Sequence, residues 1–178
     1  MGKLVEITHV SLGGQIDPLD WAFPYLDDEH TAYAEAQLVA ADALLLGRRT
    51  YEGLSAAYQT MASNSFVDRM NAIPKFVASR TLETAGWNAT VIEGDVSTFV
   101  AGLKAQQNLN LLKFGNGPLD TALMEHNLID EIHMLLTPAA VGNGRHMFEE
   151  LDGTSRLHLS EVKRFASGVV HLVYEPTV

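Results

Sequence analysis

Residues 42–52, which read DALLLGRRTYE, join an apolar run to a glycine and a basic segment. The apolar residues 43–46 predict a short strand that is buried on both faces. Tyr51, Leu54 and Tyr58 follow at helical spacing and predict a helix directly after the strand. Strands buried on both faces belong to parallel sheets that are covered by helices. This junction therefore predicts an α/β fold.

The junction at Gly47 also has the chemistry of an anion-binding turn. A glycine leaves room for a ligand to approach the backbone. Arg48, Arg49 and Thr50 add charge and a hydroxyl to the free N–H groups of the first helical turn. A phosphate suits this combination. The alternative is a structural strand-to-helix turn whose arginines are only solvated.

Composition and charge restrict the class of protein and of partner. The 178 residues suit one domain, residues 1–178, and contents of 47% hydrophobic and 19% charged residues are typical of a globular protein. The formal net charge of −10 disfavours nucleic acid and acidic membranes as partners. An anionic ligand must therefore be bound by a local group of arginines and backbone donors. No apolar run approaches the ~20 residues that span a bilayer.

Cysteine usage and the first residues bear on the cellular compartment. The chain has no cysteine, which excludes disulfides, thiolate metal sites and cysteine nucleophiles. Glu6 and His9 stand where a secretory signal would be apolar. The absence of cysteine fits either redox compartment, so a cytoplasmic protein is our default expectation.

Strand-like and helix-like segments alternate along the chain, which predicts a largely parallel sheet flanked by helices. We expect strands at 3–12, 43–46, 75–79, 90–92, 110–114 and 131–137, helices at 28–41, 96–107 and 119–126, and a further helix that ends at 68–71 before Pro74. Residues 157–165 and 169–175 predict a C-terminal antiparallel hairpin.

A second glycine turn, residues 114–119, repeats the order of strand, glycine and helix. Gly115 and Gly117 would expose backbone N–H groups at the start of the helix, and Pro118 suits the first helical position. The spacing is not G-x-G-x-x-G, so this motif alone does not identify a dinucleotide site.

A third strand end supplies Ser79 and Arg80, a hydroxyl and a guanidinium suited to a ribose phosphate. The carboxyl ends of parallel strands meet at one edge of a sheet. The three junctions together predict a ligand crevice at that edge.

Four runs carry a resemblance to a known family: residues 44–52, 75–82, 128–131 and 138–144. They resemble the dihydrofolate reductase-like family that includes the reductase domain of the bifunctional riboflavin-biosynthesis deaminase-reductase. The resemblance extends from His9 to Val170 and is closest to stand-alone, single-domain members. It implies a three-layer fold whose mixed, mostly parallel sheet is flanked by helices. It also implies NADPH as hydride donor and a homodimer.

The resemblance also assigns roles to residues at matching positions. It places the NADPH phosphates at Gly47, Arg48, Arg49 and Thr50, the 2′-phosphate side at Ser79 and Arg80, the adenine end at Gly94 and Asp95, and the pyrophosphate at Gly115, Asn116, Gly117 and Leu119.

Two positions depart from the family pattern. Ser11-Leu12-Gly13-Gly14 stands where the family usually has Ser-Leu-Asp-Gly, so an acid at the mouth of the active cleft is missing at Gly13. Asn116 replaces a residue that is commonly Gly or Ser. Because Asn tolerates left-handed backbone conformations, we expect this turn to form.

The proton source for a reduction must then come from other titratable groups. The candidates are Asp17, Asp27, Asp28, Glu29 and His30. We select Asp28 as the catalytic acid. The alternative for residues 27–29 is a helix N-cap with acids in the first turn.

Other candidate groups have plain alternatives. Trp21, Phe23 and Tyr25 could stack on a planar heterocycle, or belong to the core or a dimer contact. The seven histidines have no metal-ligand spacing, and packing explains His133 and His171, so we expect no metal. We expect Glu149 and Glu150 in a solvated turn.

The sequence thus predicts an NADPH-dependent reductase of a pteridine-like or aminopyrimidine-like heterocycle, resembling dihydrofolate reductase or 5-amino-6-(5-phosphoribosylamino)uracil reductase. The alternative is a catalytically silent nucleotide-binding or regulatory module. The late strands carry more apolar residues than one sheet face needs, which a homodimer would bury. These residues are Met134, Leu136, Val162, Phe165, Val170 and Leu172.

Overall fold

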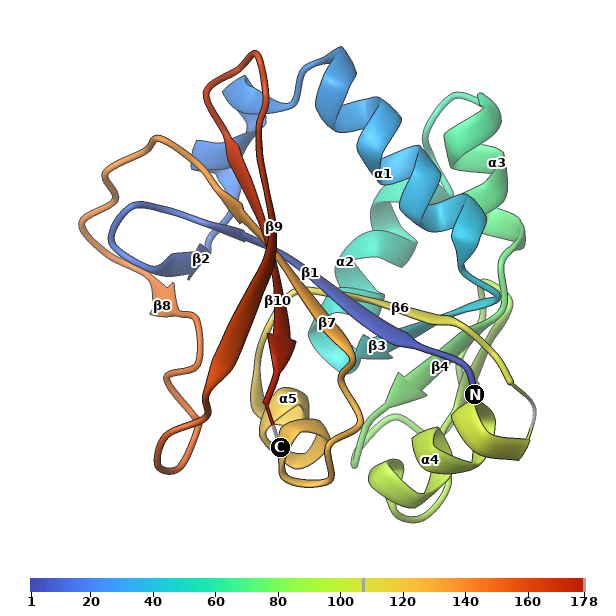
Figure 1. Cartoon of the computed structure of the whole chain (residues 1–178). Coiled ribbons are helices and arrows are strands. Elements are labelled where there is room, and N and C mark those ends of the chain that lie inside the picture. Colours follow the sequence, from blue (N-terminus) through green and yellow to red (C-terminus); the bar gives the residue numbers. More distant parts are fainter. Residues whose placement is uncertain (107, 178) are drawn as a thin grey trace. The chain divides into compact units, whose positions relative to one another are not determined.

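The expected alternation of strands and helices is present in the computed structural model, which describes residues 1–106 and 108–177 (Figure 1). Residue 107, the expected end of the helix at 96–107, lies outside this part of the chain. The elements are β1 (Leu4–Val10), β2 (Gln15–Asp17), the 3-10 helix η1 (Asp20–Tyr25), α1 (Asp28–Ala40), β3 (Ala43–Gly47), α2 (Arg48–Tyr58), α3 (Ser65–Ala72), β4 (Lys75–Ala78), β5 (Ala89–Val91), α4 (Val96–Gln106), β6 (Leu111–Phe114), α5 (Pro118–Glu125), β7 (Glu131–Leu136), β8 (Arg145–His146), β9 (Leu157–Arg164) and β10 (Val170–Pro176).

The contacts within the chain define two compact units. The first comprises Met1–Leu4 and Glu35–Phe114, and the second comprises Val5–Ala34 and Gly115–Val178. The expectation of one domain over residues 1–178 stays a prediction. Each unit contains four strands of the mixed sheet.

The first unit has strands in the order β5-β4-β3-β6, and each neighbouring pair is parallel. Residues 44–46 of β3 are fully buried, as the uninterrupted apolar run predicts. Helix α2 packs against β3 and β4, and on α4 the ring of Phe99 lies 5.2 Å from that of Phe76 in β4. Figure 1 shows α2 and α3 on one side of these strands and α4 on the other. Because the four strands run in one direction, their carboxyl ends share one edge.

The second unit has strands in the order β1-β7-β10-β9. β1 and β7 are parallel, and β10 is antiparallel to both β7 and β9. The predicted C-terminal hairpin is therefore confirmed. A separate short pair joins β2 to β8.

Polar and aromatic side chains fix the start of α1 on this sheet. The Tyr33 hydroxyl lies 2.7 Å from Nδ1 of His133, and Nε2 of His171 lies 3.2 Å from the same nitrogen. Glu131 Oε2 lies 3.1 Å from His133 Nε2. Because a carboxylate only accepts, Nε2 of His133 carries the proton and Nδ1 accepts the Tyr33 hydrogen bond. Phe165 packs beside Tyr33 with ring centres 5.8 Å apart.

The other face of the same strands is apolar and only partly covered. Met134 of β7, Leu172 of β10 and Val162 of β9 lie opposite one another in register. Met134 and Leu172 are half-buried, and Val162 is 58% exposed. Phe165 was wrongly included in this set, because it is fully buried against Tyr33 and His171 on the α1 side. Leu136 and Val170 are also half-buried and pair with each other, so the apolar surplus extends beyond this row.

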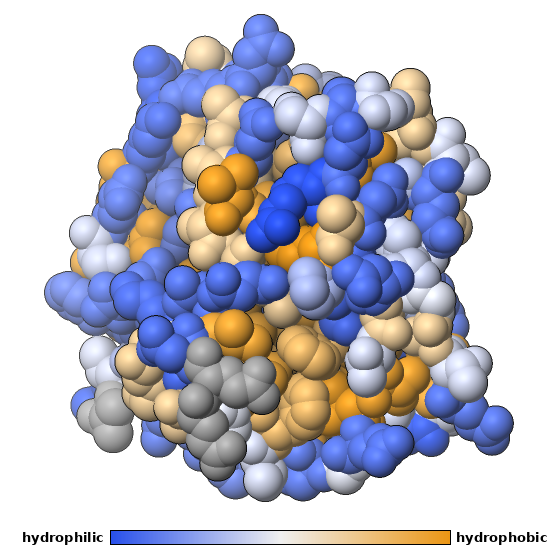
Figure 2. Space-filling model, turned by 90° about the vertical axis from the view of Figure 1, so that its right-hand side faces the viewer, coloured by the Kyte–Doolittle hydropathy of each residue, from blue (hydrophilic) through white to orange (hydrophobic). Residues whose placement is uncertain are grey.

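One face of the surface is mixed in hydropathy. Figure 2 shows the side on which α3 and α4 lie in Figure 1, where hydrophilic residues surround smaller groups of apolar ones. Within residues 1–106 and 108–177, every helix is too short or too polar to cross a membrane.

Candidate functional site

The strand-to-helix junction at Gly47 is open, as an anion site requires. Gly47 has φ −72° and ψ 158° and lies at the N-cap of α2, where no side chain caps the helix. A Cβ built on Gly47 would meet no atom within 4 Å. The first turn of α2 therefore has no capping side chain, and there is free space beside Gly47.

The arginines at this edge keep most of their charge available. Arg48 makes one loose ion pair with Glu52, 3.8 Å apart, and the two side chains are 48% and 51% exposed. Arg49 and Arg80 are exposed, and neither forms an ion pair with any residue that the structure describes. Exposed pairs of the Arg48–Glu52 kind are weak, so that an incoming phosphate competes well for the guanidinium.

The ends of β4 and β5 lie at the same edge as Gly47. Gly47 pairs with Ala78 in register, and Val77 pairs with Val91. The Ser79 hydroxyl accepts hydrogen bonds from the N–H groups of Thr81 (3.2 Å) and Leu82 (2.9 Å). These bonds form a tight turn that leaves Arg80 exposed.

Gly94 and Asp95 form the entry to α4. Gly94 has a φ of +79°, a left-handed conformation that favours glycine. Asp95 Oδ1 accepts hydrogen bonds from the Thr98 N–H at 2.7 Å and from the Thr98 hydroxyl at 2.8 Å. This carboxylate therefore caps the helix, and its contact with an adenine stays a prediction.

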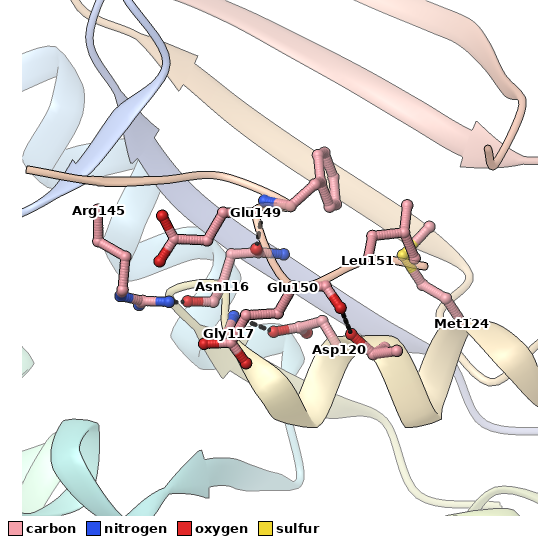
Figure 3. Close-up of a pocket in the computed structure, with 10 residues that line it drawn as sticks. Asn116, Gly117, Asp120, Met124, Arg145, Glu149, Glu150 and Leu151 are labelled. Atoms are coloured by element: carbon pink, nitrogen blue, oxygen red, sulfur yellow. Dashed lines mark hydrogen bonds between the residues drawn. The ribbon is translucent and has the colours of Figure 1, made fainter. Parts of the chain in front are cut away.

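The second unit contains the other expected phosphate turn, between β6 and α5 (Figure 3). Gly115 has a φ of +76°, so the predicted glycine turn is present. The Gly117 N–H donates to Asp120 Oδ2 at 2.6 Å, so a carboxylate of the chain itself already lies at the start of α5. Leu119 is half-buried in the first turn.

Asn116 is almost entirely enclosed in this turn. It is 7% exposed, and its side chain and carbonyl all bond within the second unit. Figure 3 shows the Arg145 guanidinium bonded to the Asn116 carbonyl, beside Gly117. Glu149 and Glu150 border a small pocket beside the β6–α5 turn. Both are exposed and form the expected solvated turn.

In the turn after β1, Gln15 fills the space beside Gly13, the position where the family resemblance leads us to expect an acid. Ser11 and Gln15 are bonded through their side chains, and Gln15 Nε2 lies 3.3 Å from His146 Nε2. A Cβ built on Gly13 would lie 2.5 Å from Gln15 Oε1. An acid at residue 13 would therefore require the Gln15 side chain to move.

The acidic cluster at residues 27–29 has mostly a structural role. Asp27 accepts from the His30 N–H at 2.8 Å and from the Ser167 N–H at 3.0 Å, and the first of these bonds lowers the pKa of Asp27 most. Glu29 accepts from the Ala166 N–H at 2.9 Å, and its bond to Lys163 lowers the pKa of Glu29. The N-cap alternative is thus confirmed for Asp27. Asp28 lies in the first turn, and its catalytic role stays a prediction.

Four of the histidines form two pairs, one partly buried and one buried. Nε2 of His9 lies 3.1 Å from Nε2 of His30, and His133 pairs with His171 as described above. Burial and the neighbouring histidine lower the pKa of both His9 and His171 to about 4, so these rings are neutral at neutral pH. Among the described residues, no group of three or more His, Cys, Asp or Glu side chains has the arrangement to hold a metal.

The expected aromatic residues around η1 have different surroundings. Phe23 is 61% exposed and is therefore not a core residue. The Tyr25 hydroxyl donates to the Pro138 carbonyl at 3.1 Å. Trp21 is half-buried, and its indole N–H has no hydrogen-bond acceptor in the described part of the chain.

Sequence reasoning missed Asp120, Arg145 and Tyr33. Asp120 had a readable signal, since an acid three residues after a glycine and two residues after a proline is a typical capping residue. Arg145 and Tyr33 had none, because their partners are 29 and 100 residues away in the sequence.

Comparisons with known proteins agree with this fold. The sequence profile of the RibD C-terminal domain matches residues 8–171. The chain is 24% identical over 166 residues to the Bacillus subtilis (strain 168) protein YyaP, a match that covers 90% of this chain and 86% of YyaP. A solved structure from Shewanella sp. PV-4, whose name connects it with riboflavin biosynthesis, aligns over 99% of both chains with a TM-score of 0.77 and 20% identity. Schistosoma mansoni dihydrofolate reductase aligns over 99% of both chains with a TM-score of 0.63 and 15% identity.

These structural likenesses confirm the predicted dihydrofolate reductase-like fold, with its mixed, mostly parallel sheet, flanking helices and C-terminal hairpin. The match of the family profile extends over most of the sequence. The chain belongs to the RibD C-terminal domain family.

Proposed function

We propose that this protein is an NADPH-dependent reductase that transfers a hydride to a pteridine-like or aminopyrimidine-like heterocycle. Its family contains reductases of this kind, which supports the reaction class. The observation that carries the proposal is the shared edge of the first unit. There the open N-cap at Gly47 and the exposed guanidiniums of Arg49 and Arg80 follow neighbouring parallel strands.

The residues at this edge fit a phosphorylated dinucleotide. The first turn of α2 offers N–H groups and the side chains of Arg48, Arg49 and Thr50 to phosphate oxygens. Ser79 and Arg80 offer a hydroxyl and a planar guanidinium to the 2′-phosphate, and a guanidinium binds phosphate in a bidentate manner. Gly94 and Asp95 would contact the adenine end.

The turn of the second unit fits the pyrophosphate less directly. Gly115, Asn116, Gly117 and Leu119 stay candidates, although the Gly115 N–H donates to the Ile7 carbonyl at 2.8 Å. The Gly117 N–H is bonded to Asp120, however, and the Asn116 amide is bonded on both sides. NADPH supplies the hydride when it is bound. The chain supplies orientation and a proton, for which Asp28 is our candidate and solvent is the alternative.

Calorimetry tests the cofactor assignment. We expect the unmodified protein to bind NADPH more tightly than NADH. Loss of a charge-assisted hydrogen bond costs about 1.5–3 kcal/mol, so Arg80→Ala should weaken NADPH binding by roughly 10-fold to 150-fold and reduce the preference over NADH.

The matched control is Arg156→Ala, which removes an exposed arginine of the second unit. It should leave NADPH binding unchanged. Equal losses for the two variants would show a non-specific charge effect, and absence of NADPH binding to the unmodified protein would refute the assignment.

The rival function is a nucleotide-binding module without turnover. The absence of the usual acid at Gly13 is the observation that favours it. A protein that binds NADPH but oxidises it with none of the pterins or ribosylaminopyrimidines offered would support this rival.

A further inference from the structure

Asn116 is buried in the β6–α5 turn, and both ends of its amide bond to the protein. We infer that Asn116 is a positioning residue that clamps the β6–α5 turn in the shape needed to bind the cofactor pyrophosphate. The inference rests on the proposed function. It changes the expected role of Asn116, because the side chain bonds to the protein and not to the ligand.

Both ends of the Asn116 amide are used, and each meets a partner of the required polarity. Nδ2 donates to Glu6 Oε1 of β1 at 3.0 Å, and Oδ1 accepts from the Phe148 N–H at 2.9 Å. A carboxylate only accepts and a backbone N–H only donates, so the orientation of the amide is fixed. Glu6 is fully buried and Asn116 is 7% exposed, which keeps water from replacing either bond.

The backbone of the turn is held as firmly as the side chain. Arg145 Nη2 donates to the Asn116 carbonyl at 2.7 Å (Figure 3). The Gly117 N–H donates to Asp120 Oδ2 at 2.6 Å, and the Asp120 N–H donates to the Gly117 carbonyl at 2.9 Å. The turn is therefore tied to β1, to β8 and the segment that follows it, and to the first turn of α5.

A smaller residue could not make both amide contacts. A serine hydroxyl is too short to reach Glu6 and the Phe148 N–H together, and glycine has no polar side-chain atom. Either replacement would disconnect the turn from β1. An aspartate would keep the acceptor for Phe148 and place a second carboxylate against Glu6. This chain thus requires an amide at residue 116 to hold the turn in one conformation before the ligand arrives.

Two ligands separate positioning of the pyrophosphate from general damage to the fold. NADPH contains a pyrophosphate, whereas adenosine 2′,5′-bisphosphate keeps the adenosine and the 2′-phosphate without it. Loss of one anchoring bond should raise the NADPH dissociation constant of Asn116→Ser and of Asn116→Asp by about 10-fold or more. Binding of the bisphosphate should change by less than about twofold.

The double variant Glu6→Gln with Asn116→Asp is the rescue. It exchanges the amide and the carboxylate between the two positions, so that the amide now on β1 would donate to the carboxylate now in the turn, with the same total charge. We expect its NADPH dissociation constant to return to within about threefold of the unmodified value. Amide hydrogen exchange of residues 115–117 and 119 without ligand should be at least about 10-fold faster in Asn116→Ser than in the unmodified protein.

The inference is overturned if Asn116→Ser binds NADPH like the unmodified protein, if it weakens both ligands equally, or if exchange at residues 115–117 and 119 does not change. An unmodified protein that binds neither ligand refutes the proposed function instead, and with it the pyrophosphate part of the inference. The exchange measurement still decides whether Asn116 clamps the turn.

Discussion

The hydrogen bond between Tyr33 and His133 provides a direct test of what fixes α1 on the sheet. Tyr33→Phe removes one hydroxyl and keeps the ring that packs on Phe165 and His171. The lost bond is short, at 2.7 Å, and its acceptor is a buried nitrogen. His171 Nε2 stays 3.2 Å from that nitrogen and partly compensates. We therefore expect a loss of about 1.5 kcal/mol in the free energy of unfolding, within the range for buried hydrogen bonds.

Urea unfolding measures this loss, and a matched variant controls for it. Tyr25→Phe also removes one hydroxyl with one hydrogen bond, to the Pro138 carbonyl, but that bond is exposed to solvent. We expect Tyr25→Phe to change the free energy of unfolding by less than about 0.5 kcal/mol. The thermal midpoint of Tyr33→Phe should fall by about 3–6 °C. Equal losses in the two variants would refute the role given to the buried network.

Three further predictions concern pH, assembly and the proton donor. The pKa of both His9 and His171 is lowered from 6.5 to about 4 in the folded protein, so the unfolded chain binds more protons between these two pH values. The free energy of unfolding should therefore decrease as the pH falls from 6.5 to about 4. A free energy of unfolding that stays constant over this range in urea titrations would contradict the burial of both rings. The row of Met134, Leu172 and Val162 should be covered in a homodimer. Light scattering should therefore give a mass of twice 19.4 kDa for the unmodified protein and the mass of a monomer for Val162→Glu. A monomeric unmodified protein would exclude this interface. Asp28→Asn should slow single-turnover reduction by about 10²-fold or more while Asp17→Asn does not, and if neither does so while Gly13→Asp accelerates reduction, the proton comes from solvent.

Local patterns in the sequence predicted most of the fold, because most helices and strands are determined by the residues within them. The run at 43–46 suited a doubly buried strand, and Pro74 marked the boundary between α3 and β4. The short elements η1, β2 and β8 were missed, because two to six residues carry no readable period.

The candidate site was predictable only in part, for the same physical reason. Glycines and arginines at strand ends are visible in sequence, and the structure places Gly47, Arg80 and Gly94 after neighbouring parallel strands. The role of Asn116 was not visible, because its partner Glu6 is 110 residues away. Sequence reasoning placed the helix cap only within residues 27–29, and the structure identifies Asp27 as the capping residue, because helix boundaries are not determined by spacing alone.

The central claim is that this protein reduces a heterocycle with NADPH bound at the carboxyl edge of β3, β4 and β5. Rapid mixing with NADPH and a panel of oxidised pterins and ribosylaminopyrimidines, followed at the nicotinamide absorbance, tests it most directly. We predict substrate-dependent oxidation of NADPH that Arg80→Ala slows at low NADPH concentration and that excess NADPH restores. A protein that leaves NADPH unbound, or that responds identically with and without Arg80, would contradict the account.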